Sequence, residues 1–515
     1  MSNTITIRKG LDLPIGGAAE LLLTDARSIT TYAMKPTDFV GLTPRLVVEE
    51  GGTVCKGDAL FVDKHDERIR ITSPVDGQVK AIIRGEKRKL LEVVVEADYK
   101  SAGSMGLDYK SSPTPQKPQT TEEIKAAMLQ CGLWTTLRQR PFGTIAKPDD
   151  QPKAIFVSAF DSAPLAPDYD FALQGKETFF VKGLEALTKL TDGKVHVCFR
   201  PGQALDRFVP RDDAKRVKHS PERENRTEVG GFNPRSQVEI HYVKGPHPSG
   251  NIGTQIAYID PINKGEVVWT MNPQDVAVLG ELFTTGVYRP EKVIAVAGPN
   301  IKNPHYYRVK AGACLAEITK DQLLSNDCHH ANVSNAAKEN RIISGDILSG
   351  TQIADEGFLG AYDDLVSILP EGDYYDFMGW LMPGFRKFSF SRTFLSGWLT
   401  TLNTLLDRFV PRDDAKRQLA TRNSQLATYK FDTNTHGDVR PLVFTDNFER
   451  VFPFDIYPTQ LIKACIVGDI DLMENLGIYE VEPEDFALCE FIDTSKTDIQ
   501  AIIREALEKL RKEAV

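Results

Sequence analysis

Short runs of alternating hydrophobic and polar residues follow one another between positions 43 and 96. Five runs are rich in aliphatic and β-branched residues, and turn residues such as Gly51-Gly52 and Asp76-Gly77 separate them. We expect Asp76-Gly77 to supply the positive φ that a tight hairpin requires. The expected strands cover residues 45–48, 59–62, 69–72, 78–83 and 90–95. This pattern predicts a compact β module over residues 1–100.

The periodicity changes after this module. Residues 101–120 are rich in Ser, Pro and Lys, which is typical of a linker. A helix is expected to begin at Thr121, with Thr as its cap and glutamates in its first turn. Apolar runs then alternate with a helical stretch up to residue 290, which predicts an α/β Rossmann-like domain over 121–290. The expected elements are strands at 154–157, 195–199 and 238–243, and a helix at 179–190.

The last third of the chain has two further patterns. Short strands return over residues 291–370 and predict a small β-rich domain of SLBB or ubiquitin-like type, followed by a connecting segment over 371–454. Residues 455–515 predict a C-terminal helical domain. Its expected helices cover 458–467, 469–475 and 498–513, the last with its apolar residues on one stripe. The fold class expected is a multidomain α+β and α/β chain.

One sequence, LDRFVPRDDAKR, occurs twice, at residues 205–216 and 406–417. The residues around the two copies do not match each other, so a solenoid repeat is excluded. Charged and polar sequence follows both copies. We therefore expect surface insertions at 205–233 and 406–437.

Composition narrows the function classes. At 515 residues the chain is too long for a single core. A net charge of −9 argues against nucleic acid as a partner. The 7 cysteines are scattered without a CxxC pair, so we expect neither a metal site nor an iron–sulfur cluster. No signal peptide and no apolar run of about 18 residues is evident, so we expect no direct membrane span.

Motifs that carry chemistry by themselves are absent, and no catalytic residue is predicted. The sequence contains neither GxGxxG nor a P-loop. The loop at 245–250, GPHPSG, could hold an anion on its amides, with His247 as a base, but a rigid polar turn explains it as well. Cys328-His329-His330 suggests a metal trio, although adjacent side chains diverge. The basic turn at 84–89 is either a docking site or a solvated turn.

The β module resembles the biotinyl/lipoyl barrel-sandwich fold. In such modules Val62-Asp63-Lys64 would form the hairpin that presents a lysine for cofactor attachment. A carrier with a modified Lys64 is therefore one hypothesis. Against it, the polar stretch at 65–68 lengthens the turn, and no acyltransferase or carboxylase motif accompanies it.

Seven motifs in order carry a second resemblance that runs nearly end to end. They are GLDLPIGG (10–17), TSPVDG (72–77), CGLWTTLRQRPF (131–142), GPHPSG (245–250), SGDILSG (344–350), WLMPGFRKFSFSRTF (380–394) and PEDFALCEF (483–491). Together they resemble the NqrA family, one of the components of the Na⁺-translocating NADH:quinone reductases. That family is similar to the flavin subunit of complex I and to the RnfC component of the Rnf complex, which implies that the central domain has the same α/β fold.

Two departures from those relatives concern cofactors. Where they carry a glycine-rich flavin loop, this chain has Trp134, Leu137 and Arg138, whose bulk should block the approach of a flavin phosphate. Where the relatives carry a C-terminal cysteine cluster for an iron–sulfur centre, the C-terminal helices of this chain have only Cys465 and Cys489. The resemblance therefore implies that this chain binds no cofactor, and that FAD, FMN, riboflavin, iron–sulfur and quinone belong to other subunits.

The function implied is that of a peripheral subunit on the cytoplasmic face of the bacterial inner membrane. The complex couples NADH oxidation and quinone reduction to outward Na⁺ transport, and the partners implied are its other subunits, chiefly the membrane component NqrB. No independent catalysis is expected. A contribution to quinone binding is expected at Phe39, Trp134 and Phe142, because a quinone ring prefers aromatic walls. An independent flavin enzyme is a weaker alternative.

Overall fold

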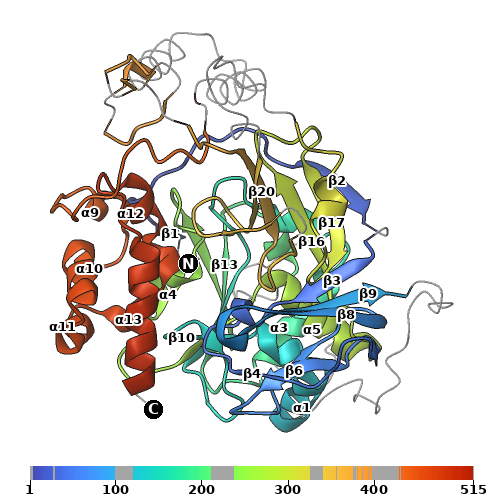
Figure 1. Ribbon diagram of the computed structural model, residues 1–515. Coiled ribbons are helices and arrows are strands. Elements are labelled where there is room, and N and C mark those ends of the chain that lie inside the picture. The colour runs from blue at the N-terminus through green and yellow to red at the C-terminus, as the bar shows by residue number, and fades with distance from the viewer. Residues whose placement is uncertain are drawn as a thin grey trace, which may run out of the picture.

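The structure is a computed structural model of the chain, in which three layered β-rich units and a group of C-terminal helices pack into one body (Figure 1). It describes residues 4–26, 29–98, 120–209, 237–324, 340–354, 357–374, 378–379, 381–384, 387–391, 394–396, 429 and 431–513. The expected linker and most of the two expected insertions lie outside the described residues.

A seven-stranded sheet forms the centre of the α/β unit, in the order β1-β14-β13-β12-β15-β10-β11. The first five of these strands are parallel to one another, and β10 and β11 are antiparallel additions at one edge. The bounds are β1 Thr4–Thr6, β10 Arg138–Arg140, β11 Thr144–Ile145, β12 Ala154–Ser158, β13 Lys194–Phe199, β14 Val238–Lys244 and β15 Val268–Thr270. The strands expected in this unit are confirmed.

Helices cover both faces of this sheet. On one face α3 (Glu177–Leu187) and α5 (Pro273–Thr285) pack against the alternate strand residues that include Ile155 and Val197. On the other face α4 (Ile252–Ile259) packs Ile256 against Phe156. The alternation of strand side chains between two buried faces explains why these runs are hydrophobic throughout.

The β module consists of two small sheets, β3-β9-β8-β5 and β4-β6-β7. Its strands are β3 Thr31–Met34, β4 Pro44–Leu46, β5 Thr53–Val54, β6 Ala59–Asp63, β7 Arg70–Thr72, β8 Gly77–Arg84 and β9 Leu90–Ala97. The expected strands are confirmed, but the role expected for Gly77 is wrong. Gly77 begins β8 without a positive φ, and a Cβ there would lie 2.0 Å from the carbonyl oxygen of Glu96. Glycine is needed because two strands approach closely, not because of a left-handed turn.

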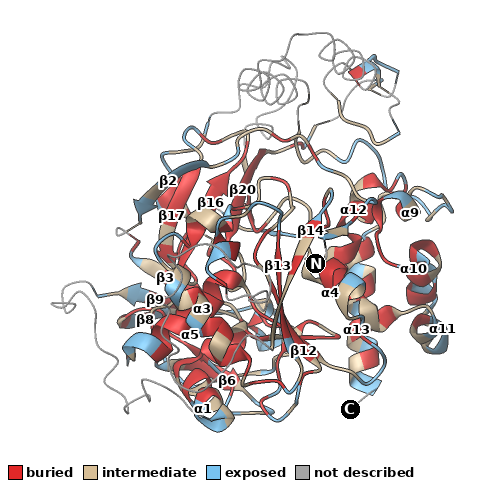
Figure 2. Cartoon of the chain, turned by 180° about the vertical axis from the view of Figure 1, so that it is seen from behind, coloured by how far each residue is buried: buried red, intermediate tan, exposed pale blue. Residues whose placement is uncertain are grey.

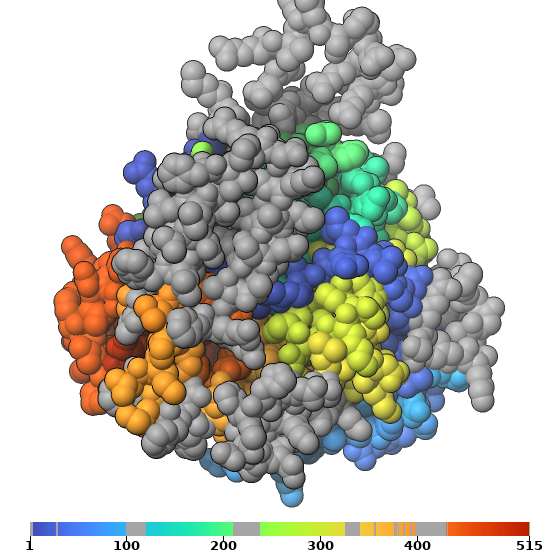
Figure 3. Space-filling model, turned by 90° about the horizontal axis from the view of Figure 1, so that it is seen from above, coloured from blue at the N-terminus to red at the C-terminus, as the bar shows by residue number. Residues whose placement is uncertain are grey.

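The first two strands of the chain belong to the α/β sheet and to a six-stranded sheet, although the sequence predicted one module over residues 1–100. Strand β1 pairs with β14 in the α/β sheet, and β2 (Glu20–Asp25) pairs with β17 in a six-stranded sheet. From above, N-terminal residues in blue adjoin yellow residues of that second sheet (Figure 3). The N-terminal segment therefore connects two units before the β module begins.

The second sheet has the order β19-β18-β20-β16-β17-β2 and forms the small β-rich domain expected after residue 291. Its further strands are β16 Glu291–Ala297, β17 His305–Lys310, β18 Asn340–Ser344, β19 Thr351–Gln352 and β20 Leu365–Pro370. A short helix, α6 (Ala316–Thr319), follows β17.

The C-terminal residues form a helical domain with its own hydrophobic core. The helices are α9 Phe448–Val451, α10 Pro458–Val467, α11 Ile470–Asn475, α12 Ala487–Ile492 and α13 Ile499–Glu513. Buried and exposed positions alternate along α10 and α13, whereas strands β12 and β13 are almost wholly buried (Figure 2). The expected apolar stripe of α13 is confirmed: Ile499, Ile503, Leu507 and Leu510 are buried.

The N-cap of helix α1 (Thr121–Cys131) lies one residue earlier than the sequence predicted. Thr120, and not Thr121 as expected, is the N-cap; it accepts a hydrogen bond from the Glu123 amide and forms a capping box with that residue. At its other end Gly132 adopts φ +82° and lies against Thr72 of the β module. None of the helices in the described ranges has both the length and the apolar character that crossing a bilayer requires.

The contact between α3 and α5 yields a test of the packing. A Cβ at Gly183 would lie 1.9 Å from the Val276 carbonyl oxygen, and one at Gly280 would lie 1.8 Å from that of Phe179. We expect Gly183→Ala and Gly280→Ala each to lower the free energy of unfolding by about 1–3 kcal/mol, because overpacking outweighs the helix propensity of Ala. Urea denaturation followed by circular dichroism measures this.

The matched control is Gly437→Ala. A Cβ at that position would have its nearest neighbour, Cε of Lys496, at 3.7 Å, which is ordinary contact. The same urea midpoint for all three variants and the unsubstituted chain would show that α3 and α5 do not pack as described.

Candidate functional site

A cavity of about 270 Å³ opens at the carboxyl ends of the parallel strands, where three units of the chain meet. This is the edge of an open α/β sheet at which ligands usually bind. The α/β unit contributes the residues after β12 and β15, including Phe160 and Asn272. The small β-rich domain contributes residues 345–350 and 362–365, and the C-terminal domain contributes Glu484 and Ala487.

Acidic side chains dominate the lining of this cleft. Asp161, Asp275, Asp346, Asp363, Asp364 and Glu484 all border it. Burial raises the pKa of Asp161 and of Asp275 to about 6 each, and it also raises the pKa of Asp363. These three carboxyls therefore hold their negative charge less readily than exposed carboxyls do.

Protein donors already bind most of these carboxylates. Asp364 accepts hydrogen bonds from Tyr169 (3.1 Å) and Asn272 (2.6 Å). Lys292, which is 5 % exposed, lies 3.6 Å from the other oxygen of Asp364. Burial opposes the charge on Lys292, but Asp275 and Asp364 outweigh that effect and its pKa is raised. The ammonium group is thus held by the wall and is not free to bind a ligand.

The glycine-rich loop at 245–250 borders the cleft but does not form an anion cradle. Its amides donate within the protein: His247 to Asp12 Oδ1 at 2.8 Å, Ser249 to the Pro246 carbonyl at 2.9 Å, and Gly250 to Ser162 Oγ at 2.7 Å. The rigid polar turn is the interpretation that the structure confirms. His247 is 3 % exposed, and its Nδ1 lies 3.1 Å from Ser162 Oγ. Burial lowers the pKa of His247, so its imidazole is neutral at pH 7.

A buried arginine joins the α/β sheet to the C-terminal domain beside this cleft. Arg140 on β10 is 3 % exposed and lies 3.4 Å from Glu482, 2.6 Å from Glu484 and 3.2 Å from Asp485. Burial opposes its charge, but the three carboxylates outweigh burial and raise the pKa of Arg140. Burial raises the pKa of Asp485 to about 7 against the opposing effect of the Arg140 charge.

Arg138, two residues before Arg140, faces the cleft itself. Its guanidinium lies 5.2 Å from the ring centre of Tyr362 and 3.3 Å from Glu482. Arg138 is positively charged and borders the cleft. Because 28 % of its side chain is accessible, its charge is partly exposed to solvent.

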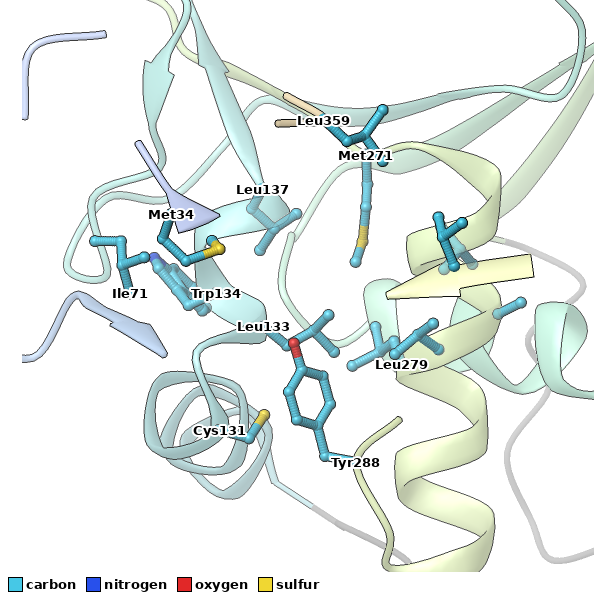
Figure 4. Close-up of a cluster of buried hydrophobic side chains, with 14 of the residues drawn as sticks. Met34, Ile71, Cys131, Leu133, Trp134, Leu137, Met271, Leu279, Tyr288 and Leu359 are labelled. Atoms are coloured by element: carbon cyan, nitrogen blue, oxygen red, sulfur yellow. The ribbon is translucent and has the colours of Figure 1, made fainter. Parts of the chain in front are cut away.

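The three residues expected near a quinone do not surround one cavity in the described structure. Trp134 is fully buried: its indole N–H donates to the Ala146 carbonyl at 2.8 Å, and its ring packs against Trp269. Figure 4 shows it between Met34 and Ile71 in the core. Phe142 packs against Tyr479 in the C-terminal domain. Quinone contact by these residues stays a prediction.

Phe39 is the member of the three that reaches a cavity. It packs edge to face against Tyr362 at 5.7 Å and borders a cavity of about 50 Å³. Tyr362, Thr136 and Asp275 line both this small cavity and the larger cleft. Leu133 and Leu137 are buried in the same core as Trp134, so the segment expected to obstruct a flavin is filled with apolar side chains.

Lys64 lies at the end of β6 and is exposed. Its amide donates to the Thr43 carbonyl at 2.8 Å. Four residues on, Arg68 forms ion pairs with Asp66 at 2.7 Å and Asp149 of the α/β unit at 2.6 Å. These contacts hold the hairpin against the neighbouring unit, whereas a swinging arm needs a free tip. Cys328-His329-His330 lies outside the described residues.

Sequence reasoning missed the acidic residues of the cleft and Arg140. Asp363 and Asp364 directly precede strand β20, and Asp161 closely follows strand β12. Polar residues at the ends of buried strands are a signal that could have identified them. Nothing in the sequence pairs Arg140 with residues 482–485, which are more than 300 positions away.

Comparison with known proteins matches consecutive parts of the chain to three family models. They are described as the NqrA N-terminal barrel-sandwich hybrid domain (residues 5–98), the NqrA second alpha/beta domain (119–221 and 216–288) and the NQRA C-terminal domain (293–355). The order of β module, α/β unit and small β-rich domain is thereby confirmed.

Similar curated proteins include those of Yersinia pseudotuberculosis serotype I (strain IP32953), at 35% identity, and of Serratia proteamaculans (strain 568) and Vibrio atlanticus (strain LGP32), each at 36%. Each match spans 511 residues, 99% of this chain and 100% of the relative. All three are described as the A subunit of Na(+)-translocating NADH-quinone reductase. A chain of an NAD+-reducing [NiFe]-hydrogenase matches at a TM-score of 0.34 and 12% identity, covering 78% of this chain and 69% of that one.

The arginine network yields a stability prediction. We expect Arg140→Met to lower the free energy of unfolding by about 3–5 kcal/mol, because it leaves buried carboxylates without a counter-charge. The measurement is urea denaturation, with limited proteolysis to show whether the C-terminal domain detaches first.

The matched control is Arg45→Met in the β module. Arg45 pairs with Glu67, but about half of each side chain is exposed, so the expected change is under about 1 kcal/mol. Equal losses for Arg140→Met and Arg45→Met would contradict the assignment of Arg140 as the contact that joins the domains.

Proposed function

Because this chain belongs to the NqrA family of the Na⁺-translocating NADH-quinone reductases, we propose that it acts as a peripheral subunit that holds no redox cofactor of its own. The chain is a subunit of an oxidoreductase that translocates an ion. In this proposal it attaches through the other subunits, chiefly the membrane component NqrB, on the cytoplasmic face of the bacterial inner membrane. Its cleft lies where open α/β sheets usually bind ligands, but it lacks the free donors and positive charge that a phosphate-bearing cofactor needs.

The acidic cleft is the observation that carries this proposal. Flavin mononucleotide and NADH both bring phosphate groups, which proteins bind with free backbone amides or with cations. Here the amides at 247, 249 and 250 donate within the protein, and carboxyls line the walls. A phosphate placed among these carboxyls would lose hydration and meet like charge. Arg138 alone among the described lining residues offers a partly exposed positive charge, and Glu482 already pairs with it.

The cysteines of the C-terminal domain support the same proposal. An iron–sulfur cluster is normally held by four cysteine thiolates. Cys465 and Cys489 are buried in the apolar core of this domain. Burial raises the pKa of Cys465 to about 12 and also raises that of Cys489 well above its usual range. Both side chains therefore act as small apolar groups in the core.

A contribution to quinone binding is a second function that one observation favours. Phe39 and Tyr362 form an aromatic wall beside a small cavity that adjoins the cleft, and Met34 and Ile71 complete its apolar side. An aromatic and apolar wall suits a quinone ring, which carries no charge. Trp134 and Phe142 would have to move to take part.

Attachment to other subunits requires an exposed surface, and the C-terminal domain provides one. Phe444, Ile466 and Val467 are 62%, 53% and 80% exposed. The ammonium group of Lys463 lies 5.3 Å from the ring centre of Phe444, and Ile466 and Val467 follow one turn later on α10. Exposed apolar side chains gathered in one place are typical of a docking surface. We name Phe444, Lys463, Ile466 and Val467 the α10 patch.

The absence of a flavin is directly testable. We expect the purified full chain to be colourless, to oxidise no NADH and to retain no flavin mononucleotide in equilibrium dialysis at micromolar concentration. Dialysis with added flavin separates a true inability to bind from loss during purification. Retention of one flavin per chain would refute the proposal and support an independent flavin enzyme.

The docking proposal is tested in the assembled complex. We expect Phe444→Lys combined with Ile466→Asp to reduce co-purification of this chain with its membrane partners at least tenfold, because each adds a charge to an apolar contact. Circular dichroism of the isolated variant should be unchanged, since both side chains are exposed. The control is Val47→Lys, at a 47% exposed position of the β module. Normal assembly of the double variant would show that the α10 patch faces solvent.

A further inference from the structure

Two histidines and a glutamate lie together on two neighbouring parallel strands of the α/β sheet. His196 lies on β13, and Glu239 and His241 lie on the neighbouring strand β14. The parallel register pairs His196 with Glu239 and Cys198 with His241. Side chains on a strand alternate between faces, so His196, Glu239 and His241 project from the same face of the sheet. It is the face covered by α4, since the His196 ring lies 4.6 Å from that of Phe156.

The donor atoms of these three residues are close enough to share one ion. Nδ1 of His196 lies 2.9 Å from Nε2 of His241 and 3.7 Å from Oε2 of Glu239, and the three donor atoms lie within 4.8 Å of one another. A tetrahedral Zn²⁺ ion with bonds of about 2.0–2.2 Å places its ligand atoms roughly 3.3–3.5 Å apart. Small side-chain rotations convert the observed spacing into that geometry.

We propose that His196, Glu239 and His241 form a binding site for Zn²⁺. Two imidazole nitrogens and one carboxylate oxygen are a donor set that zinc accepts, and a water molecule would complete four-coordination. The site lies between the start and the middle of β13 and β14, whereas the cleft lies at the carboxyl ends of the parallel strands. Its role is to join two neighbouring strands.

Nδ1 of His196 and Nε2 of His241 share a hydrogen bond of 2.9 Å, so one of these two nitrogens carries a proton in the metal-free chain. Zn²⁺ binds both nitrogens once that imidazole holds its proton on its other ring nitrogen. The Glu239 side chain is 44% exposed, which gives an ion a route from solvent.

Two neighbours define the site further. Lys194 lies 2.9 Å from Oε2 of Glu239 and competes with a metal ion for that oxygen, but 55% of its side chain is exposed and it can move away. Cys198 is on the same face but belongs to an apolar cluster with Ile7 and Val243. The ligands are therefore nitrogen and oxygen atoms.

The test uses the full chain without an affinity tag, treated with a chelator and then titrated with Zn²⁺ against a competing chromogenic chelator. We expect one high-affinity site per chain and a rise in melting temperature on binding. His241→Ala should weaken the affinity at least 100-fold, and Glu239→Gln by about 10–100-fold. Lys194→Gln should tighten it by about fivefold, because it removes a competing charge.

Controls address folding and other ligands. His65→Ala removes an exposed histidine of the β module and should not change the affinity. Glu239→Gln alters a half-exposed residue, so it remains informative if His241→Ala does not fold. A variant that replaces Cys328, His329 and His330 with Ala should bind as before. X-ray absorption of the zinc-loaded chain should show nitrogen and oxygen neighbours without sulfur.

Several results would overturn the proposal. They are the absence of a site tighter than millimolar in the unsubstituted chain, unchanged affinity in His241→Ala and Glu239→Gln, or a sulfur neighbour in the X-ray absorption spectrum. Weaker binding after Lys194→Gln would also contradict the geometry, because Lys194 would then have been supporting the site and not competing with the ion.

Discussion

The buried guanidinium of Arg140 is the contact on which the three-walled cleft depends. It extends from β10, at one edge of the central sheet, to the carboxylates of the C-terminal domain. Glu484 both pairs with Arg140 and borders the cleft, so the same ion pair that joins the domains also positions one wall. An unpaired charge in this place would be costly, which makes the alignment of the two domains specific. Gly253 contributes by leaving room for the pair: a Cβ there would lie 2.5 Å from Arg140.

The N-terminal strands fix the remaining walls. Because β1 joins the α/β sheet and β2 joins the second sheet, the short segment between them links the two units. Within that segment Asp12 accepts the His247 amide, and Gly10, at φ +143°, lies so close to the His247 carbonyl that a Cβ would be 2.1 Å away. The amides of residues 247, 249 and 250 thus donate to acceptors within the protein, two of which are side chains. These donors are used for structure and are not available to a phosphate.

The sequence predicts the individual helices and strands, but it does not predict which of them pack against each other. The strands of the β module and the helix α13 follow from local periodicity, which depends only on neighbouring residues. Local patterns cannot show that β2 leaves its module, because an edge strand reads the same in either sheet. Trp134 illustrates the same limit: an aromatic residue suits a ligand wall and a core equally well, and only the structure shows that this one packs against Trp269. His196 and His241 are 45 positions apart, so their pairing appears only when β13 lies beside β14.

The carboxyl-end cleft of the central sheet and the face covered by α4 differ in a way that bears on which ions the chain can hold. The cleft contains many carboxyls, but protein groups already bind most of them. Asp364, for example, accepts hydrogen bonds from Tyr169 and Asn272, and Lys292 lies 3.6 Å from it. Such a wall repels anions without offering a cation a free set of ligands. On the face covered by α4, two imidazoles lie 2.9 Å apart with a carboxylate alongside. A transition metal prefers these nitrogen donors to carboxylates that the protein already binds, so the more acidic site is the less suitable one for the ion.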